Sequence, residues 1–515
     1  MAHHTPDFPD AFNMADYFVF SNIEAGRGWK TAILFEGRAI SYETVAEKVS
    51  RVATQLIGDG LLPEQRVLVC MRDCPEFVYS WFGAIKAGAV VTQVNPLLPA
   101  SDYEYYLSYV KPQFAFIDEA SAPAFREAAA QSRHCGGGAN IFEAGAAFNA
   151  WLAREPKPDA LPWPTRKDDP AVWLFTSGTT GKSKGAVHTH AHFAYNTEVY
   201  AKSFIGMRED EVTISGPRLF FGYATGTNLM FPFAIGATTI LFRDQPSAEL
   251  LFEYIARHRP SVLTGVPTLI NKMLEAPASA SADLSSLRFM WSAGEALPRE
   301  LHERWDARFG VPIIDGIGSA ESFHIYISNR PGDIRPGSLG KLVPGYEAKL
   351  VDDEGAVVAQ GDVGTLWIRG ASAALYYHAA YDKSAEHLRG GWIVSGDKFR
   401  QDGDGYWYYE GRGDDLIKSG GIYVSPLEVE NCLLQHGGVA ECCVIGRGDD
   451  AGLEKPFAIV VLKPGADVSA ADLIAFAKQR IARYKAPHDV AFSATALPRN
   501  DRDKIDRKAL KAMYV

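Results

Sequence analysis

Helix-like and strand-like patterns alternate over the first 170 residues of the chain, and this alternation constrains the fold more than any other feature. Residues 42–58 place apolar side chains on one face of a helix, residues 66–71 form an apolar run typical of a buried strand, and residues 75–87 predict the next helix. Such a succession favours parallel strands joined by crossover helices. The alternation resumes after residue 185, so we predict an α/β fold.

The rest of the chain divides by pattern. Residues 332–412 contain strictly alternating strand-like segments, which predict an all-β unit. The C-terminal part predicts a small α+β unit, in which residues 469–484 form an amphipathic helix with a capping box of Ser469 and Asp472. Residues 411–422 combine glycine and charge, as exposed hinges do. We therefore predict an N-terminal domain of residues 1–413 and a C-terminal domain of residues 414–515.

Composition and charge argue against several classes of protein. The net charge of −10 is unlike that of a chain whose main partner is nucleic acid or an anionic membrane. The first residues lack the positive flank and apolar core of a signal peptide, and the longest apolar stretch, about residues 229–241, is too short to span a bilayer. The six cysteines show neither zinc-ligand spacing nor disulfide density. We predict a cytoplasmic protein with no nucleic-acid or membrane partner.

The densest chemistry lies in the segment Thr176-Ser-Gly-Thr-Thr-Gly-Lys-Ser-Lys-Gly185, directly after the strand-like residues 171–175. Glycines allow a turn that exposes backbone N–H groups, hydroxyls add donors, and lysines add positive charge. A polyphosphate requires this chemistry. The segment is not a Walker A loop, because that pattern requires glycine where residue 176 is threonine. A polar surface loop is the bland alternative.

Four further segments accompany this one. Residues 292–296 read Ser-Ala-Gly-Glu-Ala, residues 315–321 read Asp-Gly-Ile-Gly-Ser-Ala-Glu, residues 391–397 end in Ser-Gly-Asp, and residues 498–507 read Pro-Arg-Asn-Asp-Arg-Asp-Lys-Ile-Asp-Arg. Together they resemble, over nearly the whole chain, the adenylate-forming superfamily of acyl- and aryl-CoA ligases, adenylation domains and luciferases. The resemblance implies two doubly wound α/β subdomains plus a small β-barrel-like subdomain, and a small mobile α+β C-terminal domain.

The resemblance also implies an ATP site. An ionised carboxylate accepts two hydrogen bonds, which suits Asp397 for both ribose hydroxyls. Mg²⁺ is bound by one or two carboxylates plus phosphate oxygens, which suits Glu321 as the metal ligand. Lys504 and Glu321 are the implied catalytic residues. The implied ATP- and AMP-binding residues are Thr176, Ser177, Gly178, Thr179, Thr180, Gly181, Lys184, Gly294, Glu295, Ala296, Asp315, Gly316, Ile317, Gly318, Asp397 and Arg412.

Three residues depart from the family pattern. Ile317 replaces a tyrosine, as benzoate-type ligases allow, and Asp503 replaces a glycine, which predicts a stiffer loop beside the catalytic lysine. Ala320 replaces a threonine whose hydroxyl usually reaches the α-phosphate. One lost hydrogen bond to a charged group corresponds to about 1.5–3 kcal/mol. We infer that Thr179 and Thr180 compensate for it.

An aromatic segment at residues 217–224 bears on the acid substrate. Phe220 aligns with the residue that gates the acid pocket in this superfamily, and its neighbours resemble those of benzoate-type ligases. An aromatic slot suits a flat aromatic acid, whereas a fatty acid would require a longer aliphatic tunnel. His324 is compatible either with a contact to the substrate ring or with a hydrogen-bonded core histidine. The implied aryl-binding residues are Phe220, Phe221, Tyr223, Ile317, Gly318 and His324.

The C-terminal part completes the predicted reaction. The resemblance implies Asp414 as the hinge pivot, and Ser419, Gly420 and Gly421 as the loop that meets the pantetheine arm of CoA. We predict a ligase that converts benzoate, anthranilate or hydroxybenzoate, with ATP, Mg²⁺ and CoA, through an aryl-AMP into aryl-CoA, AMP and pyrophosphate. Ala320 and Ser322 differ from what a plain benzoate pocket would carry, and they favour anthranilate.

Two other functions stay open at this point. One is a stand-alone adenylation enzyme that loads an aromatic acid onto a carrier protein in trans. The other is an inactive nucleotide-binding relative, which the residues at 320 and 503 motivate and the presence of Glu321, Asp397 and Lys504 opposes. The oligomeric state is expected to be a monomer or a homodimer.

Overall fold

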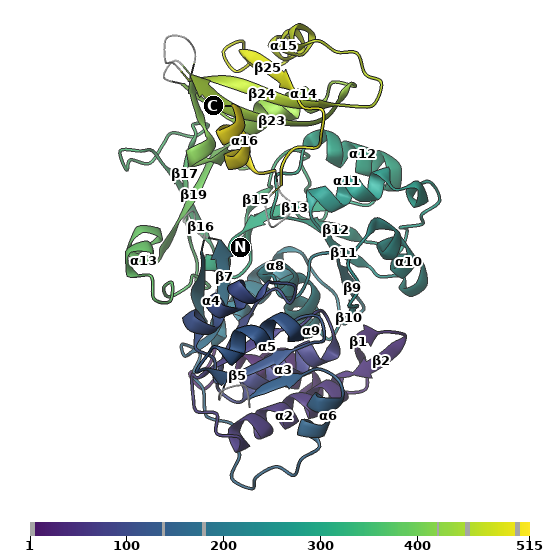
Figure 1. The fold of residues 1–515 in the computed structure, drawn as a ribbon, viewed down its shortest axis with the longest axis vertical. Helices are drawn as coiled ribbons and strands as arrows, with labels where there is room; N and C mark the ends of the chain where they lie inside the picture. Colours follow the sequence, from purple (N-terminus) through teal and green to yellow (C-terminus); the bar gives the residue numbers. More distant parts are fainter. Residues whose placement is uncertain are drawn as a thin grey trace.

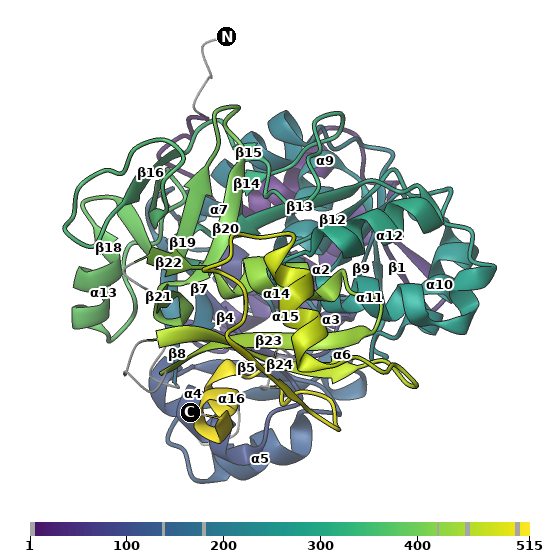
Figure 2. The same ribbon diagram turned by 90° about the horizontal axis from the view of Figure 1, so that it is seen from above.

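The computed structural model describes residues 6–135, 140–177, 182–419, 422–448, 454–499 and 505–514. A large N-terminal body carries a smaller C-terminal unit at one end (Figure 1), and seen from above this unit lies across the face of the body (Figure 2). Three sheets form the body and two form the C-terminal unit. Within the described ranges, no helix is long and apolar enough to cross a membrane.

The first large sheet has six strands and is parallel except for its last pair. Val67 and Val69 face one side of the sheet, in a core shared with α2 and α3, while Leu68 and Cys70 face α4 and α5 on the other side. The predictions for residues 42–58, 66–71 and 75–87 are confirmed within one residue. In spatial order the strands are β6 (Ile141–Glu143), β5 (Phe114–Ile117), β3 (Arg66–Cys70), β4 (Val90–Gln93), β7 (Pro170–Ser177) and β8 (Ser183–Thr189). The helices are α2 (Tyr42–Gly58), α3 (Pro75–Lys86), α4 (Ala100–Val110), α5 (Ala122–Ala130) and α6 (Ala146–Leu152).

The second large sheet has nine strands, parallel at its centre and antiparallel at both edges. In spatial order they are β15 (Lys341–Leu342), β14 (Ile325–Ser328), β13 (Ile313–Gly318), β12 (Phe289–Ser292), β11 (Val262–Gly265), β9 (Val212–Ser215), β10 (Thr238–Leu241), β1 (Thr31–Phe35) and β2 (Arg38–Ser41). Its longer helices are α7 (His190–Asn196), η3 (Thr197–Phe204), α10 (Ala248–His258), α11 (Pro267–Glu275) and α12 (Arg299–Phe309). Shorter turns follow β9, namely α8 (Gly222–Thr225), η4 (Gly226–Met230) and α9 (Phe231–Ile235).

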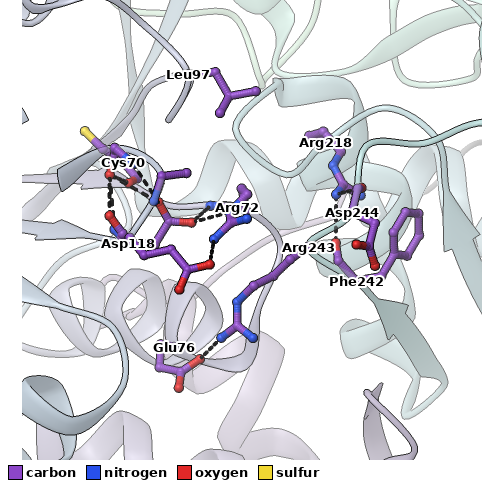
Figure 3. Close-up of polar contacts among 12 residues, drawn as sticks. Cys70, Arg72, Glu76, Leu97, Asp118, Arg218, Phe242, Arg243 and Asp244 are labelled. Carbon is purple, nitrogen blue, oxygen red and sulfur yellow. Dashed lines mark hydrogen bonds and ion pairs between the residues drawn. The ribbon is translucent and has the colours of Figure 1, made fainter. Parts of the chain in front are cut away.

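Aromatic and ionic contacts join these two sheets into one body. Phe82 of α3 stacks on Phe233 of α9 with ring centres 5.8 Å apart. Arg243, just after β10, reaches Glu76 of α3 with 3.6 Å between Nη2 and Oε2, as Figure 3 shows. In the same view Arg72, which follows β3, forms an ion pair at 2.7 Å with Asp118, which follows the neighbouring strand β5. The strand ends of both sheets therefore hold fixed positions relative to each other.

A five-stranded antiparallel sheet completes the N-terminal body. The expectation that residues 332–412 are all-β is wrong at one point, because residues 381–387 form the helix α13 (Tyr381–His387). This helix buries none of its residues, so polar helix-forming side chains rather than an apolar pattern decide its conformation. The strands are β16 (Glu347–Val351), β17 (Gly364–Arg369), β18 (Leu388–Arg389), β19 (Trp392–Gln401) and β20 (Trp407–Arg412).

The C-terminal unit has its own apolar core. The capping box of Ser469 and Asp472 is confirmed, but the predicted helix over residues 469–484 is too long. The helix ends at Lys478, and Ile481 packs against the core of the unit where the chain turns towards β25. The elements are η7 (Gly413–Asp415), β21 (Ile417–Ser419), β22 (Ile422–Val424), α14 (Pro426–Leu434), β23 (Val439–Gly448), β24 (Glu454–Leu462), α15 (Ala470–Lys478), β25 (Asp489–Phe492) and α16 (Arg507–Tyr514).

Candidate active site

The hairpin of β7 and β8 carries the predicted phosphate segment. Thr176 pairs with Lys184, and Ser177 pairs with Ser183. The ammonium of Lys184 lies 5.9 Å from the centre of the Tyr377 ring. Burial, followed by the charge of nearby Lys383, lowers the pKa of Lys184. The other predicted members, Gly178, Thr179, Thr180 and Gly181, lie outside the described residues.

The segment after β12 has an open backbone. Gly294 adopts φ +85°, and a Cβ added there would meet no atom within 4 Å. Glu295 turns its carboxylate to the start of α11, where it accepts from the backbone N–H (3.0 Å) and the hydroxyl (2.8 Å) of Thr268. The Glu295 side chain therefore holds a helix in place, and the space beside Gly294 is compatible with the predicted approach of a base.

Asp315 lies within β13, in register with Ser292 at the end of β12. Its side chain is buried, and burial raises the pKa of its carboxyl to about 8. Its Oδ1 has no hydrogen-bond partner in the structure. A buried polar atom without a partner costs free energy, so its position fits a ligand that supplies a hydrogen-bonding group, such as the edge of an adenine ring.

Glu321 sits on a tightly held loop. The hydroxyl of Tyr377 donates to Glu321 Oε1 at 2.7 Å, and the N–H of Ala374 donates to the Glu321 carbonyl at 2.7 Å. His188 Nε2 donates to the carbonyl of Ala320 at 2.7 Å. Phe323 follows with φ +68° and ψ −54°, a strained conformation for a residue with a side chain. Hydrogen bonds from several elements thus hold the loop in a shape it would not adopt alone.

The donor set around Glu321 bears on the implied metal. Among the residues that the structure describes, no three His, Cys, Asp or Glu side chains come together to bind a metal ion. Mg²⁺ does not require such a cage, because one or two carboxylates and substrate phosphates suffice. Glu321 is half-buried, and its charge acts on Lys184 of the phosphate hairpin. A carboxylate next to a phosphate-binding lysine fits a bridging divalent cation.

Asp397 and Arg412 face each other across the pair β19–β20. Their Oδ1 and Nε atoms are 3.3 Å apart, and the two residues are register partners. The Tyr409 hydroxyl also reaches Asp397 Oδ1 at 3.5 Å. The structure therefore brings together the two residues predicted to hold the ribose and the nucleotide.

A hydrogen bond joins the His324 ring to the backbone of Tyr223. His324 Nε2 lies 2.9 Å from the backbone carbonyl of Tyr223, and the two rings are 5.6 Å apart. His324 Nδ1 and the Tyr223 hydroxyl are both buried without a hydrogen-bond partner in the structure. Burial lowers the pKa of His324 to about 4. His324 is thus hydrogen-bonded in the core through one nitrogen, and its other nitrogen has no hydrogen-bond partner among the described residues.

Glycines shape the space around His324. A Cβ on Gly226 would come within 2.2 Å of the His324 ring, and one on Gly318 within 2.4 Å of its carbonyl oxygen. Ile317 packs on the same core. Phe220 and Phe221 have ring centres 4.4 Å apart, and Phe221 is 42% exposed. Gly318 lies against the backbone of His324 because β13 pairs with β14 there, and Phe221 lies at the outer side of the segment.

The C-terminal predictions are placed in part. Asp414 lies in η7, between β20 and β21, and Ser419 ends β21. Gly420, Gly421 and Lys504 lie outside the described residues. Tyr377 and Tyr409 contact the predicted site residues Glu321 and Asp397, and the sequence did not reveal them because no local pattern distinguishes them from other tyrosines.

Comparison with known proteins shows the family to which the chain belongs. The family model described as AMP-binding enzyme matches residues 21–378, and the model of the AMP-binding enzyme C-terminal domain matches residues 428–504. The chain belongs to the family of AMP-binding enzymes.

Three relatives cover nearly its whole length. A benzoate–CoA ligase of Thauera aromatica is 40% identical, over 98% of this chain and 96% of the relative. A 4-hydroxybenzoate–CoA/benzoate–CoA ligase of Rhodopseudomonas palustris is 36% identical, over 98% and 94%. The crystal structure of the anthranilate CoA ligase AuaEII in complex with anthranoyl-AMP is 36% identical and superposes with a TM-score of 0.91, covering 99% of both chains. The predicted fold of α/β subdomains, a partial barrel and a small C-terminal domain is confirmed.

Proposed function

We propose that this protein is an AMP-forming aromatic acid–CoA ligase whose acid is a benzoate that carries an amino or hydroxyl group. The ligase class rests on relatives that act on benzoate and hydroxybenzoate and match this AMP-binding enzyme over its full length. The ring substituent rests on one observation in this chain, the hydrogen bonding of His324.

The protonation of His324 follows from its partner. A backbone carbonyl only accepts, so the nitrogen that contacts the Tyr223 carbonyl must carry the hydrogen. With its pKa lowered to about 4 by burial, His324 is neutral at pH 7 and has a single N–H. Nδ1 is therefore a buried acceptor without a partner in the protein. An amino or hydroxyl group on the bound ring satisfies this acceptor, whereas unsubstituted benzoate leaves it unpaired.

Adenylation places two anions together. The carboxylate oxygen of the acid forms a bond to the α-phosphorus of ATP, and the bond from that phosphorus to pyrophosphate breaks. Lys184 of the phosphate hairpin and the catalytic Lys504 offset the negative charge, and Asp397 and Arg412 hold the nucleotide. Glu321 would hold Mg²⁺, which when bound neutralises phosphate charge and aligns the phosphate oxygens.

Thioester formation uses the aryl-AMP. The CoA sulfur bonds to the acyl carbon, the acyl–phosphate bond breaks, AMP leaves and the thiol proton passes to solvent. The C-terminal domain turns at Asp414 between the half-reactions, which withdraws Lys504 and brings residues 419–421 to the pantetheine arm. Closure also excludes water, which would hydrolyse the aryl-AMP.

The test is a substrate panel with two versions of the enzyme. AMP release is measured with benzoate, anthranilate, 2-, 3- and 4-hydroxybenzoate, cinnamate and a medium-chain fatty acid, each with and without CoA. We expect a CoA-dependent preference for one amino- or hydroxybenzoate. In His324→Phe, kcat/KM for that acid falls about tenfold, the effect of one hydrogen bond, while kcat/KM for benzoate changes less than about twofold.

Benzoate serves as the internal control, because it lacks the donor that His324 would bind. An equal loss for benzoate would show that His324 acts only through packing. Preference for the fatty acid would refute the aromatic pocket. Activity that needs no CoA would point to loading of a carrier protein.

A further inference from the structure

The outer edge of β8 is covered in two different ways. Residues 375–378 run beside it as a short extra strand, with hydrogen bonds of 2.9 Å from Leu375 N–H to the Val187 carbonyl and from Val187 N–H to the Tyr376 carbonyl. The last backbone bond of this kind runs from His378 N–H to the Gly185 carbonyl, also 2.9 Å. The N–H of Gly185 and the carbonyl of Ser183, nearer the phosphate segment, are left to other partners.

Two tyrosines of α4 supply the hydrogen-bond partners of these two backbone groups. The Tyr105 hydroxyl donates to the Ser183 carbonyl at 2.5 Å. The Tyr109 hydroxyl accepts from the Gly185 N–H at 3.2 Å and donates to the His378 carbonyl. Tyr109 thus ties β8 to the same short strand that carries Tyr377, the partner of Glu321.

Tyr105 and Tyr109 lie next to each other on one face of α4. They are four residues apart on α4, which places them on one face of the helix, and their rings stack with centres 5.6 Å apart. Burial raises the pKa of Tyr105 to about 12 and also raises the pKa of Tyr109, so both hydroxyls keep their protons at neutral pH. Two protonated hydroxyls therefore hold the backbone on either side of Lys184.

We propose that Tyr105 and Tyr109 are positioning residues that fix Lys184 for the phosphates of ATP. Lys184 lies between the two backbone groups that the hydroxyls hold, and its ammonium lies over Tyr377 near Glu321. Without the hydroxyls, the end of β8 loses its outer hydrogen bonds and Lys184 samples more positions. The role assigned to Lys184 belongs to the proposed function; the contribution of the tyrosines is a separate claim.

The first test measures ATP binding by calorimetry on the full chain, without any acid. Tyr105→Phe and Tyr109→Phe keep both rings and remove only the hydroxyls. We expect each to weaken ATP binding about three- to tenfold, the effect of one neutral hydrogen bond. Tyr103→Phe is the matched control, because its hydroxyl donates from the same helix to a different carbonyl, that of Asn95, at 3.0 Å. We expect it to change ATP binding less than about twofold.

A double-mutant cycle with Lys184→Ala tests whether the tyrosines act through the lysine. If they do, Tyr109→Phe has almost no further effect on ATP affinity once Lys184 is gone. Full additivity would overturn the proposal, as would ATP binding equal to that of the Tyr103→Phe control. A thermal melt of each variant shows whether a loss of binding reflects unfolding.

A third measurement separates this proposal from the proposed function. Thioester formation from supplied aryl-AMP no longer requires the triphosphate, so Tyr105→Phe and Tyr109→Phe should leave its rate unchanged. A parallel loss in that half-reaction would overturn the positioning role. Failure of the wild-type chain to activate any aromatic acid would overturn the proposed function and leave the ATP-affinity result intact.

Discussion

The nucleotide site and the cleft between the domains are built in opposite ways. Around the site, buried side chains hold the backbone, as His188 holds the Ala320 carbonyl and Tyr377 holds Glu321. The cleft between the N-terminal body and the C-terminal unit has a volume of about 610 Å³ and is lined by a mixture of charged, tyrosine, polar and aliphatic side chains. Two ion pairs line it, Arg400 with Glu410 and Lys485 with Glu428, and each pair lies within one domain.

This difference matches the two tasks of the reaction. Charge that develops in adenylation is stabilised best by groups already in position, because they need no reorganisation. A domain that must turn between two half-reactions benefits from an interface that is charged and solvated, since such contacts contribute little and separate easily. Side-chain hydrogen bonds thus hold the predicted nucleotide site in the N-terminal body, while ion pairs within each domain line its boundary with the C-terminal unit.

The largest expected effect is that of Lys504→Ala. If the C-terminal domain serves adenylation through this one side chain, adenylation falls at least about a hundredfold, near 2.7 kcal/mol, while thioester formation from supplied aryl-AMP is spared. The two half-reactions are measured separately. Lys508→Ala, at an exposed position of α16, is the control. Equal losses in both half-reactions would remove the division of labour between the regions.

The pH dependence of the free energy of unfolding tests the burial of Asp315 in the predicted nucleotide site. Asp315 has a folded-state pKa raised to about 8, so the folded chain holds a proton that the unfolded chain releases near pH 4. Its stabilising effect is complete below about pH 4, declines by about 1.4 kcal/mol per pH unit and is lost above about pH 8. Asp315→Asn removes this slope. Between pH 6 and pH 8, the free energy of unfolding of ATP-free wild type should fall by about 2–3 kcal/mol more than that of the variant, and parallel profiles would refute the burial argument.

Removing the hydroxyl of Tyr377 tests how firmly the loop that carries Glu321 is held. Tyr377→Phe deletes the hydrogen bond to the Glu321 carboxylate. A bond to a charged group contributes about 1.5–3 kcal/mol, so we expect the adenylation rate to fall about tenfold or more. Tyr376→Phe, whose side chain is 44% exposed on the neighbouring position, should change the rate less than about twofold. Similar rates for both variants would mean that Glu321 needs no support.

The smallest effect is expected in the cleft. Lys485→Ala breaks the pair with Glu428, whose atoms Nζ and Oε2 are 2.6 Å apart. A partly exposed pair of this kind contributes about 0.5 kcal/mol, and salt screens it. Thermal unfolding at low and high salt measures the change. A loss of several kcal/mol, or one insensitive to salt, would show that the cleft is as preorganised as the site.

Local patterns predicted the regular elements of the fold well. The helix over residues 42–58 and the strand that begins at residue 66 were predicted closely because their apolar spacing is complete within the segment. The helix α13 was missed and α15 was predicted too long, since exposed polar residues carry little pattern and a helix end depends on packing elsewhere. The order of strands in the two large sheets could not be read from any single segment.

The sequence alone determined the family and predicted which segments carry the chemistry, because glycine, hydroxyl, lysine and carboxylate residues follow apolar strands at recognisable positions. Glu321, Asp397 and the phosphate segment were predicted in this way without a structure, and their roles stay predictions. Only the tertiary structure decided how these groups are held: Tyr377 reaches Glu321 from 56 residues away, and the Tyr223 carbonyl sets the protonated nitrogen of His324 from 101 residues away. Hydrogen bonds between such distant residues depend on the folded path of the chain, which no local pattern contains.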